Sequence, residues 1–225
     1  MKVLSRDDAG LWRGTETFGS GPFNYGCEAN LAGDLVATLA DRSVVEVFRF
    51  DGAGWTPDGE LSGLGTLRAI ELGTDFIAVT NTVEQVLVTP FADGADEDQQ
   101  PSWGEVLVEA EVTGADSALS AGGFGLSLAV SGRNLVVGAP TADSGAGALF
   151  VFEVDDSGTP RFQARALAPN AGTPFEGASA TQIGDRFSSG LAVWGPVIGS
   201  GAIEVGDVIS NSPPGVGTVY VFGVP

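Results

Sequence analysis

The feature that most constrains this chain is a sixteen-residue segment that occurs twice towards the C-terminus. Residues 124–139 read FGLSLAVSGRNLVVGA and residues 187–202 read FSSGLAVWGPVIGSGA. They align without a gap, with Phe187 on Phe124, Gly195 on Gly132 and Gly201 on Gly138. In each copy, apolar residues alternate with small or polar residues on both sides of a turn, which predicts a pair of short antiparallel strands. A chain that repeats such a unit is expected to fold by stacking its copies.

The segments that follow the best copy predict a four-stranded meander. ALFVFEV (148–154) predicts a third strand and RFQARAL (161–167) a fourth, with the turn DDSGTP between them. Two weaker copies precede it, at residues 25–40, where Tyr25-Gly26 replaces Phe-Gly, and at residues 64–80. Because one meander does not bury both of its faces alone, the four copies are expected to pack against one another.

An aromatic residue marks each predicted fourth strand, and these strands suggest how the ends of the chain are related. Trp55, Trp103 and Phe162 lie in the fourth strands of three copies, and the last copy ends after its third strand at Phe222. LWRGTETF, with Trp12, is a similar strand at the start of the chain. We expect this strand to complete the last copy and close a ring, because closure removes open sheet edges. The alternative is that the chain is a segment of a longer protein.

These residues resemble the Phe-Gly/Gly-Ala-Pro (FG-GAP) repeats of the integrin alpha-chain β-propeller and its bacterial relatives. The similarity is close in 124–168, good in 187–222 and limited to the pattern in 23–110. It implies an all-β fold, a β-propeller of about four four-stranded antiparallel blades within residues 1–225. The blades are expected at 23–61, 64–110, 124–168, and 187–222 together with 9–18. Gly125 and Gly138 would allow close backbone approach, and aromatic residues would fill the space between sheets.

Charge and composition exclude several classes of partner. The net charge is −19, from 29 acidic and 10 basic residues, so nucleic acid and anionic membranes are expected to be repelled. No stretch approaches the roughly 18 consecutive apolar residues of a membrane span, and the N-terminus MKVLSRDDAGLWRG has no apolar region of the kind found in signal peptides. The family resemblance nevertheless implies an extracellular or cell-surface location.

The family resemblance also raises the question of calcium, which relatives often bind in the loop after Gly-Ala-Pro. Here that loop is TADSGAG, where Asp143 and Ser144 supply the side-chain oxygens that follow Thr141. The corresponding loop of the last copy offers Glu204, Asp207 and Asn211. Neither spacing matches a compact calcium loop. We therefore expect solvated turns and no bound cofactor, with calcium as the alternative.

Other conspicuous residues have a structural and a functional interpretation. Asp93, Asp96, Glu97 and Asp98 form the densest acidic cluster, and they fall in a predicted hairpin, which favours a solvated tip over a weak cation site. Cys27 is the single cysteine, so no intrachain disulfide forms. It occupies the position of Leu126 in the best copy, which favours a small buried side chain over a reactive thiol.

The tryptophans divide into two groups. Trp12, Trp55 and Trp103 recur at matched strand positions, which favours packing over a platform for stacking a ligand. Trp194 lies outside this series, because it replaces Ser131 beside the turn. It is the tryptophan that we expect to be exposed for contact with a partner.

No residue pattern points to a catalytic site. The chain has no histidine, no Gly-x-Ser-x-Gly motif and no phosphate-binding loop, so we assign no catalytic, cofactor-binding or metal-binding residue. The first hypothesis is a non-catalytic interaction or adhesion module of the integrin-alpha-like kind, which binds a protein or glycan partner. The alternatives are a carbohydrate-active enzyme that uses central carboxylates, and a fragment of a larger surface protein without independent function.

Overall fold

The computed structural model shows an all-β protein. It describes residues 2–6, 9, 11–17, 29–40, 42–90, 106–107, 122–167, 187–202 and 218–223. These residues form five antiparallel sheets and one four-residue helix, α2 (Ala142–Gly145). Within this part of the chain, no helix is long and apolar enough to cross a membrane.

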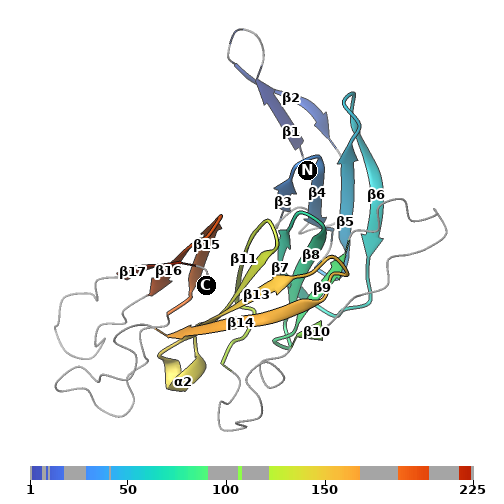
Figure 1. The fold of residues 1–225 in the computed structure, drawn as a ribbon. Coiled ribbons are helices and arrows are strands. Elements are labelled where there is room, and N and C mark those ends of the chain that lie inside the picture. Colours follow the sequence, from blue (N-terminus) through green and yellow to red (C-terminus); the bar gives the residue numbers. More distant parts are fainter. Residues whose placement is uncertain are drawn as a thin grey trace, which may run out of the picture.

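Four of the sheets follow one another along the chain and lie side by side in a row (Figure 1). The first sheet contains β3 (Ala29–Ala32), β4 (Leu35–Leu39), β5 (Val45–Phe50) and β6 (Trp55–Leu61). The second contains β7 (Leu67–Leu72), β8 (Phe76–Asn81), β9 (Val86–Pro90) and β10 (Val106–Leu107). The third contains β11 (Ser127–Ser131), β12 (Asn134–Ala139), β13 (Ala148–Val154) and β14 (Pro160–Leu167). The fourth contains β15 (Gly190–Trp194), β16 (Val197–Ala202) and β17 (Thr218–Gly223).

Strand register confirms the alignment of the repeats. Ser127 pairs with Gly138 in the third sheet, and Gly190 pairs with Gly201, at the aligned positions, in the fourth. The first and third sheets also share a β-bulge at the same place in the third strand, after Val47 and after Val151. The aligned copies therefore share both the strand pairing, which the repeat predicted, and a local irregularity, which it did not.

The hydrophobic core lies between successive sheets rather than within one. Three clusters of buried side chains join the first sheet to the second, the second to the third and the third to the fourth. The predicted role of the aromatics between sheets is confirmed for five phenylalanines that are at most 1% exposed: Phe76, Phe124, Phe150, Phe152 and Phe187. Each sheet is thus stabilised mainly by its neighbour.

Close backbone approach at the predicted glycines is also confirmed. Gly125 has φ +78°, and a Cβ there would come within 3.0 Å of Thr80 in the second sheet. A Cβ on Gly138 would lie 2.7 Å from the carbonyl oxygen of Ser188, at the start of the fourth copy. Ser188 itself takes the place of Gly125 and adopts the same left-handed backbone, with φ +71°. In the third and fourth copies, the Phe-Gly position therefore contacts the preceding sheet.

The N-terminal strand differs from the expectation. Trp12–Thr17 is strand β2, but it pairs with β1 (Lys2–Arg6) in a separate two-stranded sheet, not with β17 of the fourth sheet. Figure 1 shows β1 and β2 beyond the first sheet and away from the fourth. The prediction that residues 9–18 complete the last blade is therefore wrong for this structure. Lys2–Arg6 is close in sequence, so pairing with it closes a short loop at small entropic cost.

Candidate functional site

Four hairpin turns lie together at one end of the row of sheets, the upper end in Figure 1. Each joins the first two strands of a sheet, and we call them the turn row: Gly33-Asp34, Thr74-Asp75, Gly132-Arg133 and Gly195-Pro196. The Thr74 amide donates to the Gly132 carbonyl at 3.2 Å. The Gly195 amide donates to Ser131 Oγ at 3.0 Å. Such bonds between neighbouring turns hold the turn row as one surface.

Asn30 joins the first sheet to the second beside the turn row. Its side-chain amide donates to Glu71 Oε2 at 2.8 Å, and its Oδ1 accepts a hydrogen bond from the Leu72 amide at 3.3 Å. Both contacts cross from β3 to β7. This cross-link fixes the spacing between the first two turns.

A cavity of about 730 Å³ opens among the turns of the first three sheets. This volume is within the range of small-molecule sites. Its charged lining consists of four carboxylates and two guanidinium groups: Asp34, Glu71, Asp75, Asp156, Arg49 and Arg133. Acidic groups are therefore in excess, which favours ligands that carry cationic groups or hydrogen-bond donors.

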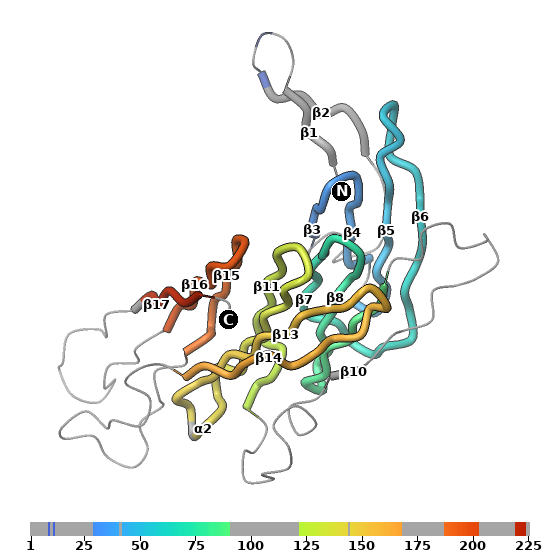
Figure 2. Tube along the Cα trace, in the orientation of Figure 1, coloured from blue at the N-terminus to red at the C-terminus, as the bar shows by residue number. Residues whose placement is uncertain are grey.

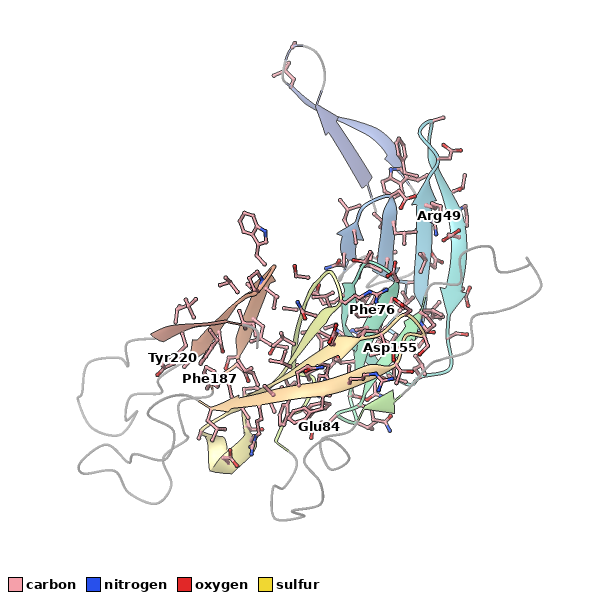
Figure 3. The ribbon with its side chains drawn as sticks, viewed as in Figure 1. Arg49, Phe76, Glu84, Asp155, Phe187 and Tyr220 are labelled. Carbon is pink, nitrogen blue, oxygen red and sulfur yellow. The ribbon has the colours of Figure 1, made fainter. Side chains whose placement is uncertain are left out.

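Each arginine of the cavity bridges two carboxylates. Arg49, on β5, lies 3.2 Å from Asp58 and 3.3 Å from Asp34 (Figure 3). The hydrogen bond to Asp58 is the main cause of a raised pKa of Arg49, with Asp34 adding to it. Arg133 hydrogen-bonds Asp156 and, at 3.3 Å, Asp75, and these two contacts raise the pKa of Arg133 in that order. The arginines thus orient the carboxylates around the cavity.

The turn between β13 and β14 positions Asp156 for this contact. The neighbouring Asp155 accepts hydrogen bonds from Ser157 Oγ at 2.6 Å, from the Thr159 amide at 3.0 Å and from Arg161 Nε at 3.0 Å. The hydrogen bond from Ser157 is the largest cause of a pKa of Asp155 well below the usual aspartate range. Because its side chain satisfies the turn's amide donors, the turn is rigid and holds Asp156 towards the third sheet's own Arg133.

The two described tryptophans behave as predicted. Trp194 is 86% exposed at the end of the turn row, so its predicted exposure is confirmed. Trp55 is half-buried, with its ring centroid 5.3 Å from that of Phe50, which confirms packing. The side chains of Trp12 and Trp103 lie outside the described residues.

The solvated-turn interpretation implied that Asp143 stands free in solvent, but its carboxylate forms an ion pair. Asp143 lies in α2, and its carboxylate receives Arg165 Nη2 at 2.7 Å. Within the described ranges, no group of three or more histidine, cysteine, aspartate or glutamate residues is arranged to hold a metal. Several other predicted features lie outside the described residues: Cys27, the cluster Asp93, Asp96, Glu97 and Asp98, and Glu204, Asp207 and Asn211. The Ser144 side chain is also not described.

Sequence reasoning missed the cavity. Asn30, Glu71 and Arg133 belong to three different repeats, and each is an ordinary polar residue at or near a turn. Of these, only the Gly132-Arg133-Asn134 turn attracted attention, as a turn. A signal existed in principle, since Asp34, Asp75 and Arg133 all stand next to the aligned hairpin turn, so stacking the repeats brings them together.

Comparison with known proteins gives information about the fold through solved structures. No family model and no curated protein matches the chain. Among solved structures it is similar to a protein from Lactobacillus plantarum, with 12% identity, TM-score 0.53, and coverage of 99% of this chain and 62% of that one. It is also similar to the computationally designed Ika4 protein, with 13% identity, TM-score 0.50, and coverage of 92% and 96%.

A third similarity is to the Cps50 (Swd1) β-propeller domain of Myceliophteria thermophila, with 10% identity, TM-score 0.46, and coverage of 79% and 50%. The chain thus spans nearly all of Ika4, about three fifths of the Lactobacillus protein and half of the Cps50 domain. At these identities the first two similarities show a shared fold and nothing about activity.

Proposed function

We propose that this chain is a non-catalytic interaction module of the β-propeller type, which binds a protein partner across the turn row. The observation that carries the proposal is the turn row itself. Hydrogen bonds join adjacent turns, a cavity of about 730 Å³ opens among three of them, and the exposed Trp194 stands at the fourth. Binding surfaces are commonly loops held by a rigid scaffold.

The propeller assignment rests on the arrangement of the sheets. The first strands of successive sheets, β3, β7, β11 and β15, contact one another in order, as the innermost strands of blades do. Each sheet packs its face on the next. These contacts support our proposal that the four sheets are four blades, and the FG-GAP resemblance supports an integrin-alpha-like, extracellular module.

The charges of the cavity indicate the chemistry of the partner. Asp75 and Asp156 are 54% and 85% exposed at their side chains, although both contact Arg133. Exposed carboxylates in excess, on a chain of net charge −19, attract a basic segment and steer its approach. We therefore expect the partner to present lysine or arginine side chains to the cavity.

Binding of a lysine- and arginine-rich peptide library to the purified chain tests this proposal. The double variant Asp75→Asn with Asp156→Asn removes two cavity charges and is expected to weaken binding about tenfold or more. Glu84→Gln is the matched control, because Glu84 lies in the turn between β8 and β9, at the other end of the second sheet (Figure 3). Equal binding by the wild type and both variants would contradict the proposal. If the chain bound glycans on a printed array but none of the peptides, the partner would be a glycan and not a protein.

A carbohydrate-active enzyme is the second candidate, favoured by the carboxylates that three sheets bring to one cavity. Asp34, Asp75 and Asp156 each contact a guanidinium group, and Glu71 accepts a hydrogen bond from Asn30. Glycoside hydrolysis needs one acid and one base or nucleophile among such groups. Turnover of a polysaccharide library that disappears in Glu71→Gln would favour this candidate over the interaction module.

A further inference from the structure

The two faces of the fourth sheet differ in what covers them. One face packs on the third sheet through Ile198, Ala202 and Phe187, which are at most 3% exposed. The opposite face, here called the outer face, carries Trp194, Val197, Val219 and Val221, which are 86%, 46%, 73% and 70% exposed. Alternate residues of β15, β16 and β17 point to the same side of the sheet, which assigns the remaining positions of the outer face. All of these remaining positions are glycine or alanine.

The outer face repeats an interface that the chain already uses. Val219 and Val221 align with Leu149 and Val151 of the third sheet, which are 0% and 3% exposed because the fourth sheet covers them. Gly201 aligns with Gly138, which lies against Ser188. The outer face therefore has the composition of a buried sheet face, although no strand among the described residues packs on its valines.

The first sheet of the same chain does not serve as the cover. Its corresponding face carries Val36, Thr38 and Phe48, which are already buried, at 7%, 0% and 6% exposure. Figure 2 also places the first and fourth sheets at opposite ends of the row. The first sheet is therefore excluded as the cover of the outer face.

We propose that the outer face of the fourth sheet binds the same face of a second copy of this chain, in a two-fold symmetric dimer. The face has no charged residue, so two copies of net charge −19 can meet there without placing like charges in contact. It also combines a projection with a depression. Trp194 projects at one end, while added Cβ atoms on Gly199 and Gly201 would meet nothing closer than 3.8 Å. In the dimer each indole lies over the glycines of the other copy.

The size of the face sets the strength of the dimer. Three strands about 4.8 Å apart, with three outward residues on each, cover about 300 Å². A standard interface buries about 800 Å² on each partner. The dimer is therefore weak, with a dissociation constant in the range of about 100 μM or above, and added salt strengthens it by screening the repulsion between copies.

Sedimentation velocity over a concentration series up to about 1 mM tests the dimer. Two variants change the outer face without disturbing the packed one: Val221→Asp adds a charge, and Gly199→Val fills the depression. The controls are Val83→Asp, a valine that is 69% exposed in a turn of the second sheet, and Gly59→Val, a strand glycine with open space around its Cβ position. Thermal unfolding of each variant checks that it folds.

The expected result is a concentration-dependent dimer in the wild type and both controls, weakened at least tenfold in Val221→Asp and Gly199→Val. A monomer at every concentration overturns the proposal, as does a dimer that both outer-face variants leave unchanged. Hydroxyl-radical footprinting of Val219 and Val221 adds a second measurement. If these residues are protected in a monomer, a segment of the same chain covers them, and the second copy is excluded. None of these variants alters the cavity, so failure here leaves the proposed function standing.

Discussion

The third and fourth sheets carry the same strand pattern but different surroundings. Leu149 and Val151 of the third sheet are buried, whereas the aligned Val219 and Val221 of the fourth are exposed. The register of the first two strands is the same in both sheets. At these aligned positions the valines and leucine are buried where another described sheet packs on them, and the repeat pattern alone does not reveal which copy lacks that neighbour.

The same comparison predicts that the third and fourth sheets differ in how far their stability depends on the phenylalanine that joins each of them to the preceding sheet. Phe124 joins the third sheet to the second, and the fourth sheet packs on the third sheet's other face. Phe187 joins the fourth sheet to the third, and no further sheet among the described residues packs on the fourth. Phe187 also contacts Tyr220 and Phe222, at ring centroid distances of 5.4 and 5.7 Å. Figure 3 shows Phe187 and Tyr220 close together.

Phe187→Ala is therefore expected to lower the free energy of unfolding of the fourth sheet by about 3–5 kcal/mol and to leave the third sheet largely protected. Amide hydrogen exchange measured by mass spectrometry would show lost protection over residues 190–202 but not over 127–139. Phe124→Ala is expected to reduce protection in both ranges. If the two variants gave the same exchange pattern, the fourth sheet would not be the loosely attached end of the row.

A pair of aligned glycines sharpens the comparison. Gly138→Ala places a methyl group against Ser127 Oγ, which donates to the Ser188 carbonyl, and 2.7 Å from that carbonyl oxygen, so it is expected to destabilise the chain by about 1–3 kcal/mol through overpacking. Gly201→Ala adds the same methyl group with nothing closer than 3.8 Å, and it is expected to be neutral or to stabilise by about 0.5 kcal/mol, because alanine restricts the unfolded chain more than glycine. Urea denaturation of both variants measures the difference. Equal effects would mean that something not seen here covers Gly201.

The repeat pattern predicted most of the fold because it fixes local register. Alignment of residues 187–202 with 124–139 correctly placed each strand pair, the turn between them and the exposure of Trp194. These features depend on neighbours in sequence and on one sheet-to-sheet contact. They were predictable for that reason.

The partner of the N-terminal strand and the cavity were not predictable in the same way. Counting strands identified Trp12–Thr17 as a strand without a sheet. A count does not decide, however, whether this strand pairs with Lys2–Arg6 or with β17. The cavity depends on Asn30, Glu71 and Arg133, from three repeats, and no spacing within one repeat records how successive turns are juxtaposed. Both features are properties of the stacking and not of the repeat.

Ser188 gives a smaller test of the contact between the third and fourth sheets. Its Oγ donates to the Ala148 carbonyl at 2.6 Å, and its own carbonyl accepts from Ser127 Oγ at 2.5 Å. Ser188→Ala removes the first bond and keeps the left-handed backbone, so it is expected to cost about 1–2 kcal/mol. Ser188→Gly removes the same bond but relieves the backbone, so it is expected to be about 1 kcal/mol more stable than Ser188→Ala. Thermal unfolding measures both, and a reversed order would show that the backbone at this position is unstrained.

The smallest expected effect is that of acid, which is expected to destabilise the third sheet and to leave the fourth sheet unchanged. The described residues of the fourth copy, 187–202 and 218–223, contain no carboxylate, whereas the outer turn of the third sheet depends on Asp155. Hydrogen bonds from Ser157 and Thr159 lower the pKa of Asp155 in the folded chain. Its stabilising contribution is therefore complete above the ordinary aspartate pKa of about 4 and is lost as pH falls below that value towards the lowered pKa.

Hydrogen exchange by mass spectrometry at pH 5 and at pH 3, corrected for the intrinsic exchange rate at each pH, is expected to show weaker protection of residues 154–161 at the lower pH and no such change over 190–202. Asp155→Asn, which lacks the titrating carboxylate, should show weaker protection of this turn already at pH 5 and little further loss at pH 3. Because Asp155 also fixes the turn that carries Asp156, the acid-induced change should reach the cavity through Arg133. A loss of protection that began in the fourth sheet would instead indicate that carboxylates outside the described residues hold that sheet in place.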